Sequence, residues 1–311
     1  MGMYCFGIDV GGTTVKCGLF KIDGTLVEKW EITTHSENSG ERILPDVAQA
    51  ILDKCQTTGI PLNQVSGVGV GVPGPVKADG TLDCAVNLHW GYKNIVKELE
   101  DILHVPVKAA NDANVAALGE MWKGGGTGAN NMIMVTLGTG VGGGIIVDGK
   151  IVAGSHGAGG EIGHAHVEDN MVEPCNCGNR GCLEQFASAT GIARMAREEL
   201  NASQEPSLLR QGNVSAKTVF DAYKEKDDLA TRVVERFGNY LGTALACFSV
   251  VVDPDVIVLG GGVSRAGDVL IDCVGKYYRE DAFQGCKDTQ LVLARLGNDA
   301  GIYGAAKLIV S

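Results

Sequence analysis

The apolar positions at the start of the chain fall into three short runs that are separated by turn residues. Residues 5–10 and 15–20 are largely apolar, and 25–32 mixes apolar with charged residues. A glycine-rich turn at 11–14 and the dipeptide Asp23-Gly24 lie between these runs. Asp-Gly between alternating apolar positions is a strong hairpin signal. The pattern therefore predicts an antiparallel β-meander.

The same pattern occurs again after Asn131, with Gly138-Thr139-Gly140 as its first turn. A gap-free superposition pairs Val10 with Val135, Thr14 with Thr139, Gly18 with Gly143, and Asp23-Gly24 with Asp148-Gly149. The chain thus contains an internal duplication. Two lobes with equivalent glycine turns could hold one polyphosphate in a shared cleft, although the glycines could also serve only to form hairpins.

Between and after these meanders, strands and helices are expected to alternate. Apolar residues recur with the helical period over 43–55 and 229–248, whereas continuous apolar runs at 65–72 and 256–259 indicate buried strands. Other expected elements are a strand over 105–109 and helices over 113–122, 189–200 and 301–310. The alternation predicts an α/β fold.

One segment concentrates residues that bind metal ions. It contains Glu161-x-x-His164, then Cys175-x-Cys177-x4-Cys182, and then Glu184. One histidine and three cysteines can complete a tetrahedral zinc site, and such a four-ligand site is normally structural because a catalytic zinc keeps one position open for water. Buried free cysteines beside an unrelated histidine are the alternative. The small and polar residues around the cysteines favour zinc, and the two carboxylates at its edges suggest that it supports a binding site.

The first glycine turn carries a carboxylate and two hydroxyl groups next to backbone amides. Its sequence is Asp9-x-Gly11-Gly12-Thr13-Thr14. This is neither a Walker loop, which needs GxxxxGK[ST], nor a Rossmann turn, because a strand and not a helix follows. Amides and hydroxyls can bind phosphate oxygens, and Asp9 could orient Mg²⁺ through water, although a turn-capping role would also explain this carboxylate.

Other polar residues follow predicted strands or stand next to glycines. Asn111-Asp112 lies where a strand ends and a helix begins, so Asp112 could accept a proton there, although a plain helix cap is the simpler explanation of the dipeptide alone. Carboxylates and amides, the groups that Glu161 and Asn87 carry, can bind the hydroxyl groups of a sugar. Gly260-Gly261-Gly262 follows a buried strand and could lie against an adenosine, or could be needed only for packing.

Composition narrows the range of partners. The 311 residues carry a formal net charge of −11, which argues against nucleic acid because phosphate binding needs a basic face. A secretory signal and a membrane-spanning apolar run are not evident, so we expect a cytoplasmic protein without membrane contact, in which the remaining cysteines are reduced thiols. The chain also exceeds the usual size of a single core, which favours two lobes.

Taken together, the motifs resemble the ROK family of repressors, open reading frames and sugar kinases. The resemblance rests on Asp9-x-Gly-Gly-Thr, Gly71-Val-Pro-Gly74, Asn111-Asp-Ala-Asn114, Leu137-Gly-Thr-Gly140, Glu161-Ile-Gly-His164, the CxCGxxGCxE segment and Leu259-Gly-Gly-Gly262. It implies a two-lobed α/β fold of the actin-like, ribonuclease H-like ATPase type, with a duplicated meander and a cleft between lobes. The small lobe is expected to contain residues 1–110 and the C-terminal helix at about 300–311, and the large lobe residues 111–299.

The resemblance also implies site roles. Asp112 would be the general base. The sugar ligands would be Asn87, Asn111, Asp112, Glu161, His164 and Glu184; the nucleotide and Mg²⁺ would be held by Asp9, Gly11, Gly12, Thr13, Thr14, Gly138, Thr139, Gly140, Gly260, Gly261 and Gly262; and structural Zn²⁺ would be held by His164, Cys175, Cys177 and Cys182. His164 would bind both zinc and sugar.

The activity implied is transfer of a phosphoryl group from ATP to the 6-hydroxyl of a hexose. The segment Val86-Asn87-Leu88-x-Trp90 is similar to that of bacterial glucokinases within the family, which favours glucose. The alternatives are an N-acetylmannosamine or N-acetylglucosamine kinase, a fructokinase, or a sugar-sensing regulator without activity. A DNA-binding repressor is not expected, because the first strand begins at once. A homodimer or homotetramer is expected.

Overall fold

The computed structural model describes residues 2–310, which form two compact units. Of the residues described, unit 1 contains 2–128, 144–160 and 295–310, and unit 2 contains Ala129–Gly143 and Glu161–Ala294. Residues 111–128 and 144–160, which the expected division assigned to the second lobe, thus lie with the first sheet. None of the helices described has the length and apolar character that a bilayer crossing requires.

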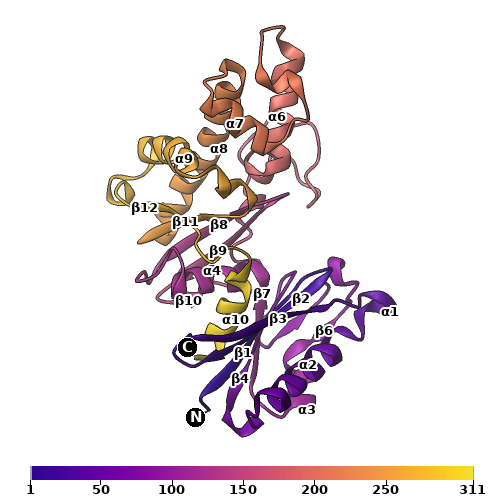
Figure 1. The fold of residues 1–311 in the computed structure, drawn as a ribbon. Coiled ribbons are helices and arrows are strands. Elements are labelled where there is room, and N and C mark those ends of the chain that lie inside the picture. The colour runs from indigo at the N-terminus through magenta and orange to yellow at the C-terminus, as the bar shows by residue number, and fades with distance from the viewer. Residues whose placement is uncertain (1, 311) are drawn as a thin grey trace. The chain divides into compact units, whose positions relative to one another are not determined.

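Unit 1 is built on a five-stranded sheet with the strand order β3-β2-β1-β4-β7 (Figure 1). Its strands are β1 (Tyr4–Val10), β2 (Thr14–Lys21), β3 (Leu26–Thr33), β4 (Val65–Val72) and β7 (Val107–Asn111). The first three are antiparallel neighbours, which confirms the predicted meander, and β1, β4 and β7 run parallel. Their carboxyl ends therefore share one edge of the sheet.

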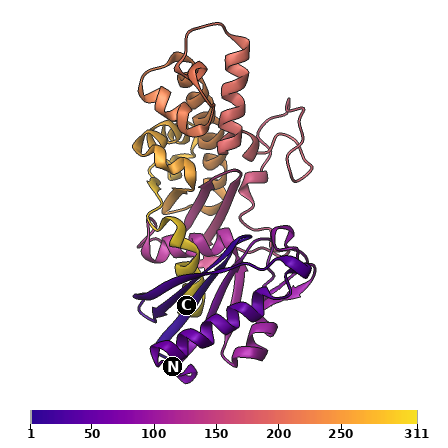
Figure 2. The same cartoon turned by 45° about the vertical axis from the view of Figure 1, so that its right-hand side comes forward.

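The two faces of this sheet are covered by different helices. Phe6 and Ile8 of β1 pack into the core beneath α2 (Ile43–Thr58) and α3 (Ile95–Leu103), while Cys5 packs on the opposite face with Ile302 and Ala306 of α10 (Ala300–Val310). This alternation is the two-residue period of a strand. Figure 2 shows α2, the long indigo helix, lying across its face of the sheet.

Helix α10 approaches the first sheet backbone to backbone. A Cβ atom on Gly7 would lie 2.0 Å from the carbonyl oxygen of Ile302, and one on Gly69 would lie 1.7 Å from that of Ala305. Gly304 of α10 is equally close to Val115 of α4 (Asp112–Lys123). These glycines leave room for the helix, so β1, β4 and α4 are held in one fixed arrangement by α10.

A buried carboxylate completes this arrangement at the end of α4. Glu120 has no solvent exposure, and its oxygens accept hydrogen bonds from the backbone N–H groups of Gly125 (2.7 Å), Arg295 (3.0 Å) and Leu296 (2.7 Å). Charge-assisted bonds to backbone amides replace the lost hydration of the carboxylate. Glu120 therefore ties α4 to the segment that leads into α10.

The second sheet repeats the plan of the first, with the order β10-β9-β8-β11-β12. Its strands are β8 (Met132–Leu137), β9 (Val141–Val147), β10 (Lys150–Ile151), β11 (Val256–Gly260) and β12 (Gln290–Leu293). Strands β8, β11 and β12 are parallel. The duplication is thus confirmed. Strand β9 belongs to unit 2 up to Gly143 and to unit 1 from Gly144 on.

The helices of unit 2 are α5 (Glu184–Ala187), α6 (Ala189–Ala202), α7 (Ala216–Lys224), α8 (Asp228–Val252) and α9 (Asp268–Asp281). Helix α8 packs against α6, α7 and α9 and buries Val234, Phe237, Leu241 and Leu245, as its periodicity predicts. Short elements are α1 (Glu37–Gly40), β5 (Thr81–Leu82), β6 (Lys93–Asn94) and the 3-10 turns η1 (Leu62–Gln64), η2 (Val86–Leu88), η3 (Ile162–His164), η4 (Leu208–Gln211), η5 (Gly262–Ala266), η6 (Gln284–Cys286) and η7 (Gly297–Asp299).

One expected strand is displaced. The strand predicted over 105–109 is β7 at Val107–Asn111, because the segment before it contains Pro106, which has no N–H group to donate to a neighbouring strand. The pairing with β4 accordingly extends to Asn111, which lies opposite Val72. Strand β7 therefore ends at Asn111, and α4 begins at the next residue, Asp112.

Candidate functional site

The first glycine turn joins β1 to β2 and is fixed by its neighbours. The N–H group of Gly11 donates to the Thr14 oxygen (3.0 Å), and the hydroxyl and N–H groups of Thr34 donate to the carbonyl oxygens of Gly11 (2.7 Å) and Thr13 (3.0 Å). Thr34 therefore fixes the turn by donating hydrogen bonds to two of the turn's carbonyl oxygens. These bonds do not use the N–H groups of Gly12 and Thr13, the donors that a phosphate could take.

Asp9 lies one residue before the end of β1 and is half-buried. Burial raises its pKa to about 6; Lys16 lowers the pKa and Asp112 raises it further. Lys16 is the cross-strand partner of Asp9 in β2, and its Nζ atom donates to the Asn298 oxygen (3.1 Å). The helix α10 passes so close that a Cβ on Gly301 would lie 2.5 Å from the Asp9 carboxylate.

Asn111 and Asp112 stand at the junction of β7 and α4. The Asn111 oxygen caps the helix by accepting from the N–H groups of Ala113 (3.0 Å) and Asn114 (3.1 Å), and its Nδ2 donates to the Gly74 oxygen (3.1 Å). Asp112 is the first helical residue and accepts a bond from the Ala113 N–H group (2.8 Å). A helix N-terminus stabilises a carboxylate, so Asp112 is placed where an ionised base is favoured.

These residues share the carboxyl edge of the first sheet. In the register, Gly71 of β4 is paired with Asp9 on one side and with Ala110 on the other. Two strand spacings, about 10 Å, separate the backbones of β1 and β7. Asn87 lies in η2 with an exposed side chain, and its carbonyl oxygen is 3.4 Å from a Cβ built on Gly12. Unit 1 therefore brings Asp9, the glycine turn, Asn87 and Asp112 to one region.

Unit 2 places the second glycine turn against the residues that follow the cysteines. The turn is closed by a bond from the Gly138 N–H group to the Gly140 oxygen (3.0 Å). Glu184 accepts a bond from the N–H group of Val141 (3.0 Å), and the Thr190 hydroxyl donates to the Thr139 oxygen (2.7 Å). A Cβ on Gly140 would lie 2.0 Å from Glu184 Oε2, so a side chain there would displace the Glu184 carboxylate from this position.

The predicted metal ligands meet in unit 2. The ligand atoms of His164, Cys175, Cys177 and Cys182 all lie within 4.8 Å of one another. Cys175 Sγ is 3.7 Å from His164 Nδ1, and Cys177 Sγ is 3.6 Å from Cys182 Sγ. Tetrahedral zinc with Zn–S bonds of about 2.3 Å separates sulfur ligands by about 3.8 Å. The four residues therefore fit a zinc ion. Their loop, with little regular structure, is the pink segment that extends from unit 2 in Figure 2.

The two carboxylates at the edges of this cluster contact it from different sides. Glu184 Oε1 is 3.6 Å from Cys175 Sγ, and Glu161 Oε2 is 4.0 Å from His164 Nε2. His164 Nδ1 lies toward the cysteine sulfur atoms, so Nε2 is the ring nitrogen that could contact a hydroxyl group of a ligand. Glu161 and His164 are each partly exposed, so both can reach a ligand.

The third glycine segment has a packing role at its centre. Gly261 has φ +82°, and a Cβ there would lie 2.5 Å from the Leu137 oxygen. Gly262 has nothing within 4 Å of such a Cβ and begins η5, a 3-10 turn. Packing therefore explains Gly261, whereas the space beside Gly262 is open.

Comparison with known proteins identifies the chain. The ROK family profile matches residues 5–311. The chain belongs to the ROK family. The resemblance drawn from the motifs is confirmed.

Relatives of the chain within the ROK family include sugar kinases and also a "putative xylose repressor" of Caldicellulosiruptor (27% identity, 98% of this chain and 77% of that one). The chain is 42% identical to a glucokinase of Halalkalibacterium halodurans, over 97% of this chain and 94% of that one. It is similar to the ROK hexokinase of Thermus thermophilus (TM-score 0.83, 32% identity, 99% and 98% of the two chains) and to a ROK glucokinase of Streptomyces griseus in complex with glucose and AMPPNP (TM-score 0.75, 32% identity, 98% of each chain). The predicted actin-like ATPase fold is thereby confirmed.

Two residues that the motif analysis of this ROK chain overlooked are Lys16 and Thr34. Lys16 of β2 lies opposite Asp9 of β1. Counting outward from the centre of the 11–14 turn pairs residue 9 with residue 16, so the sequence did contain this signal. Thr34 lies beyond β3, and only the folded meander brings it to the turn.

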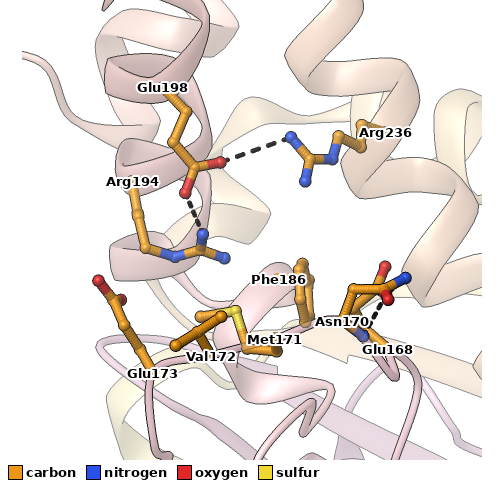
Figure 3. A pocket seen from close by; sticks show the side chains of 9 residues that line it. All are labelled: Glu168, Asn170, Met171, Val172, Glu173, Phe186, Arg194, Glu198 and Arg236. Atoms are coloured by element: carbon orange, nitrogen blue, oxygen red, sulfur yellow. Dashed lines mark hydrogen bonds and ion pairs between the residues drawn. The ribbon is translucent and has the colours of Figure 1, made fainter.

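A separate pocket of about 360 Å³ lies in unit 2 of the ROK chain, beside the cysteine loop (Figure 3). Glu198 lies between two guanidinium groups in it, paired with Arg194 and at 3.5 Å from Arg236. Glu168 and Glu173 also line the pocket. Both arginines are therefore already paired with Glu198, and two further carboxylates line the pocket. The pocket does not suit a phosphate group.

Proposed function

We propose that the chain is a glucose kinase that transfers the γ-phosphoryl group of ATP to the 6-hydroxyl of glucose. The observation that carries this proposal is the convergence of Glu161, His164 and Glu184 on one four-ligand metal cluster. Ring hydroxyls need several fixed donors and acceptors, and this cluster supplies them. The relative from Streptomyces griseus, a glucokinase in complex with glucose and AMPPNP, supports the same substrates.

In the proposed reaction, Asp112 takes the proton of the 6-hydroxyl while the oxygen forms a bond to the γ-phosphorus. The bond between that phosphorus and the leaving oxygen of ADP breaks in the same transfer. The helix N-terminus keeps Asp112 ionised before the reaction. Glucose 6-phosphate and ADP are the products.

The other roles follow from the motifs. Asn87, Asn111, Glu161, His164 and Glu184 are proposed to bind the sugar. The three glycine segments, with Asp9, Thr13, Thr14 and Thr139, are proposed to bind the nucleotide, and Asp9 would orient Mg²⁺, which neutralises phosphate charge. His164, Cys175, Cys177 and Cys182 would hold a structural zinc ion. The Asn111 oxygen already accepts the helix-cap bonds and its Nδ2 already donates to the Gly74 oxygen, so one N–H of the amide remains for a sugar hydroxyl.

An ADP-release assay tests the proposal. Glucose, fructose, mannose, N-acetylglucosamine and N-acetylmannosamine are offered with ATP, and the phosphorylated position is located by NMR. Parallel samples with polyphosphate, which releases no ADP, are followed by NMR of the sugar phosphate alone. We expect the highest kcat/KM with glucose and ATP and phosphorylation at the 6-position. Preference for an N-acetylated sugar or fructose would favour the other ROK activities, and sugar binding without ADP release would indicate a regulator.

The proposed enzyme would act in the cytoplasm on free hexose and nucleotide, without nucleic acid or a membrane. Self-association as a homodimer or homotetramer is also proposed. Light scattering of the purified chain measures it, and a mass close to 32.5 kDa would contradict it.

A further inference from the structure

A strained segment of unit 1 lies directly after the meander. Asn38 (φ 48°, ψ 49°), Ser39 (φ 59°, ψ 28°) and Gly40 (φ 61°) adopt the left-handed conformation in succession. For residues with a side chain this conformation brings Cβ close to the next carbonyl oxygen, so it is unfavourable in a single residue and uncommon in a run. Such a segment persists only where its surroundings hold it.

The surroundings that hold it are the turn that carries Asn87. The indole N–H of Trp90 donates to the Gly40 oxygen (2.9 Å), and His89 Nδ1 lies 3.1 Å from the Ser36 oxygen. Trp90 is only 3% exposed, so its bond to Gly40 is shielded from water. A bond between buried groups costs more to break than one at the surface.

The turn itself is closed by the same tryptophan. The backbone groups of Ala85 and Trp90 exchange two hydrogen bonds, of 3.0 and 3.1 Å, and Leu88 between them is fully buried. Asn87 is left at the exposed tip. The position of the Asn87 amide therefore depends on the placement of Trp90, and that depends on Gly40.

We propose that Ser36–Gly40 is a clamp that sets hexose affinity and selectivity, with Trp90 as the positioning residue between the clamp and Asn87. The proposal rests on the proposed sugar kinase function and deepens it. The clamp acts on the sugar, because it contacts the turn of Asn87. Thr34, just before the clamp, donates hydrogen bonds to carbonyl oxygens of the first glycine turn. These bonds do not involve the N–H groups of Gly12 and Thr13.

Two glycine substitutions isolate the clamp. A Cβ on Gly40 would lie 2.5 Å from the Leu88 oxygen and 2.6 Å from Trp90 Nε1, so Gly40→Ala forces the clamp away from the turn. Gly59, at the end of α2, has a similar φ of +70° but nothing within 4 Å of its Cβ. Gly59→Ala thus carries the same backbone penalty without the contact and serves as the matched control.

Glucose and AMPPNP are titrated separately into each protein by calorimetry, and kcat/KM is measured with glucose and N-acetylglucosamine. We expect Gly40→Ala to weaken glucose binding about tenfold, the loss of roughly one buried hydrogen bond, while its AMPPNP affinity stays unchanged. Its preference for glucose over N-acetylglucosamine should fall as well. Gly59→Ala should bind both ligands as the wild type does. Equal glucose affinity in the two variants would overturn the clamp.

Trp90→Phe keeps an aromatic ring but removes the indole N–H donor together with the volume of the second ring, and it tests the proposal where Gly40→Ala does not fold. We expect cooperative unfolding and a glucose affinity reduced severalfold with AMPPNP binding retained. Wild-type glucose binding by a folded Trp90→Phe protein would overturn the proposal. If the wild type itself neither binds nor phosphorylates any hexose, the proposed function fails, which is a different result from equal behaviour of the two glycine variants.

Discussion

Glu184 accepts a hydrogen bond from the backbone N–H group of Val141 at 3.0 Å. The same carboxylate lies 3.6 Å from Cys175 through its other oxygen. One side chain therefore connects the cluster of His164 and three cysteines to the end of the second glycine turn. A residue expected from its motif only to bind sugar also supports the proposed phosphate-binding turn.

We therefore expect Glu184→Ala to weaken both glucose and AMPPNP binding, the latter by about tenfold, because the turn loses a charge-assisted bond. Glu161→Ala is the comparison, since Glu161 contacts His164 and is expected to affect glucose alone. Calorimetric titration measures both affinities. Unchanged AMPPNP binding by Glu184→Ala would show that the turn does not depend on this bond.

Asp112→Asn removes the proposed base while keeping the size of the side chain. We expect kcat to fall by roughly 10²-fold or more, because an amide cannot take the hydroxyl proton, while glucose binding is largely kept. Single-turnover ADP release with saturating glucose gives the rate. Near-normal turnover would remove Asp112 from this role.

Cys177→Ser tests the link between metal and sugar. We expect loss of zinc, measured by atomic absorption, together with loss of glucose affinity, because the metal holds His164 in place. Cys84→Ser, another exposed cysteine but outside the cluster, is the control and should change neither. A zinc-free protein with normal glucose binding would refute the coupling.

The raised pKa of Asp9 predicts that the stability of the protein depends on pH. Its folded-state pKa of about 6 exceeds the ordinary value of 3.8, so the folded state holds a proton that the unfolded state releases between these values. The stabilisation from protonated Asp9 is complete below pH 3.8 and is lost as pH rises through 6. Without Mg²⁺ or nucleotide, Asp9→Asn should therefore gain stability relative to the wild type by about 2 to 3 kcal/mol between pH 4 and 6.5. Urea unfolding at several pH values measures this difference, and parallel curves for the two proteins would contradict it.

Glu120→Gln should destabilise unit 1 by about 2 to 4 kcal/mol, because an amide NH₂ then faces buried backbone N–H groups. Glu280→Gln, on the exposed side of α9, is the matched control and should change the unfolding free energy little. Denaturant titration compares the two variants. Equal unfolding free energies would mean that Glu120 is not needed to hold α4.

The elements with strong periodicity could be predicted from the sequence, and those held by distant partners could not. The meanders, α2, α8 and α10 follow from apolar spacing and Asp-Gly turns. In the Asp-Gly turn of the second meander, Asp148 and Gly149 both have positive φ, as a type I′ turn requires. Helices α3, α7 and α9 were not predicted, although the N-caps Asn94 and Ser215 mark the first two in the sequence.

For the site, the clustering of His164 with three cysteines could be predicted because closely spaced cysteines and glycines determine their own geometry. The contacts of Lys16, Thr34 and Trp90 could not, since each depends on a strand register or on a loop from elsewhere in the chain. The second bond of Glu184, to Val141, is of the same kind. Local spacing predicts ligand sets, whereas the residues that position them are known only from the fold.

The contacts of α10 also determine the order in which the molecule can be assembled during synthesis. Strand β1 is synthesised before α10, yet α10 covers one face of it, and all of unit 2 is synthesised between the two. The cluster that Cys5 and Phe20 form with Ile302 and Ala306 therefore cannot assemble until α10 has been synthesised. Unit 2 can become compact on the ribosome, whereas the first sheet to be made is the last to be completed.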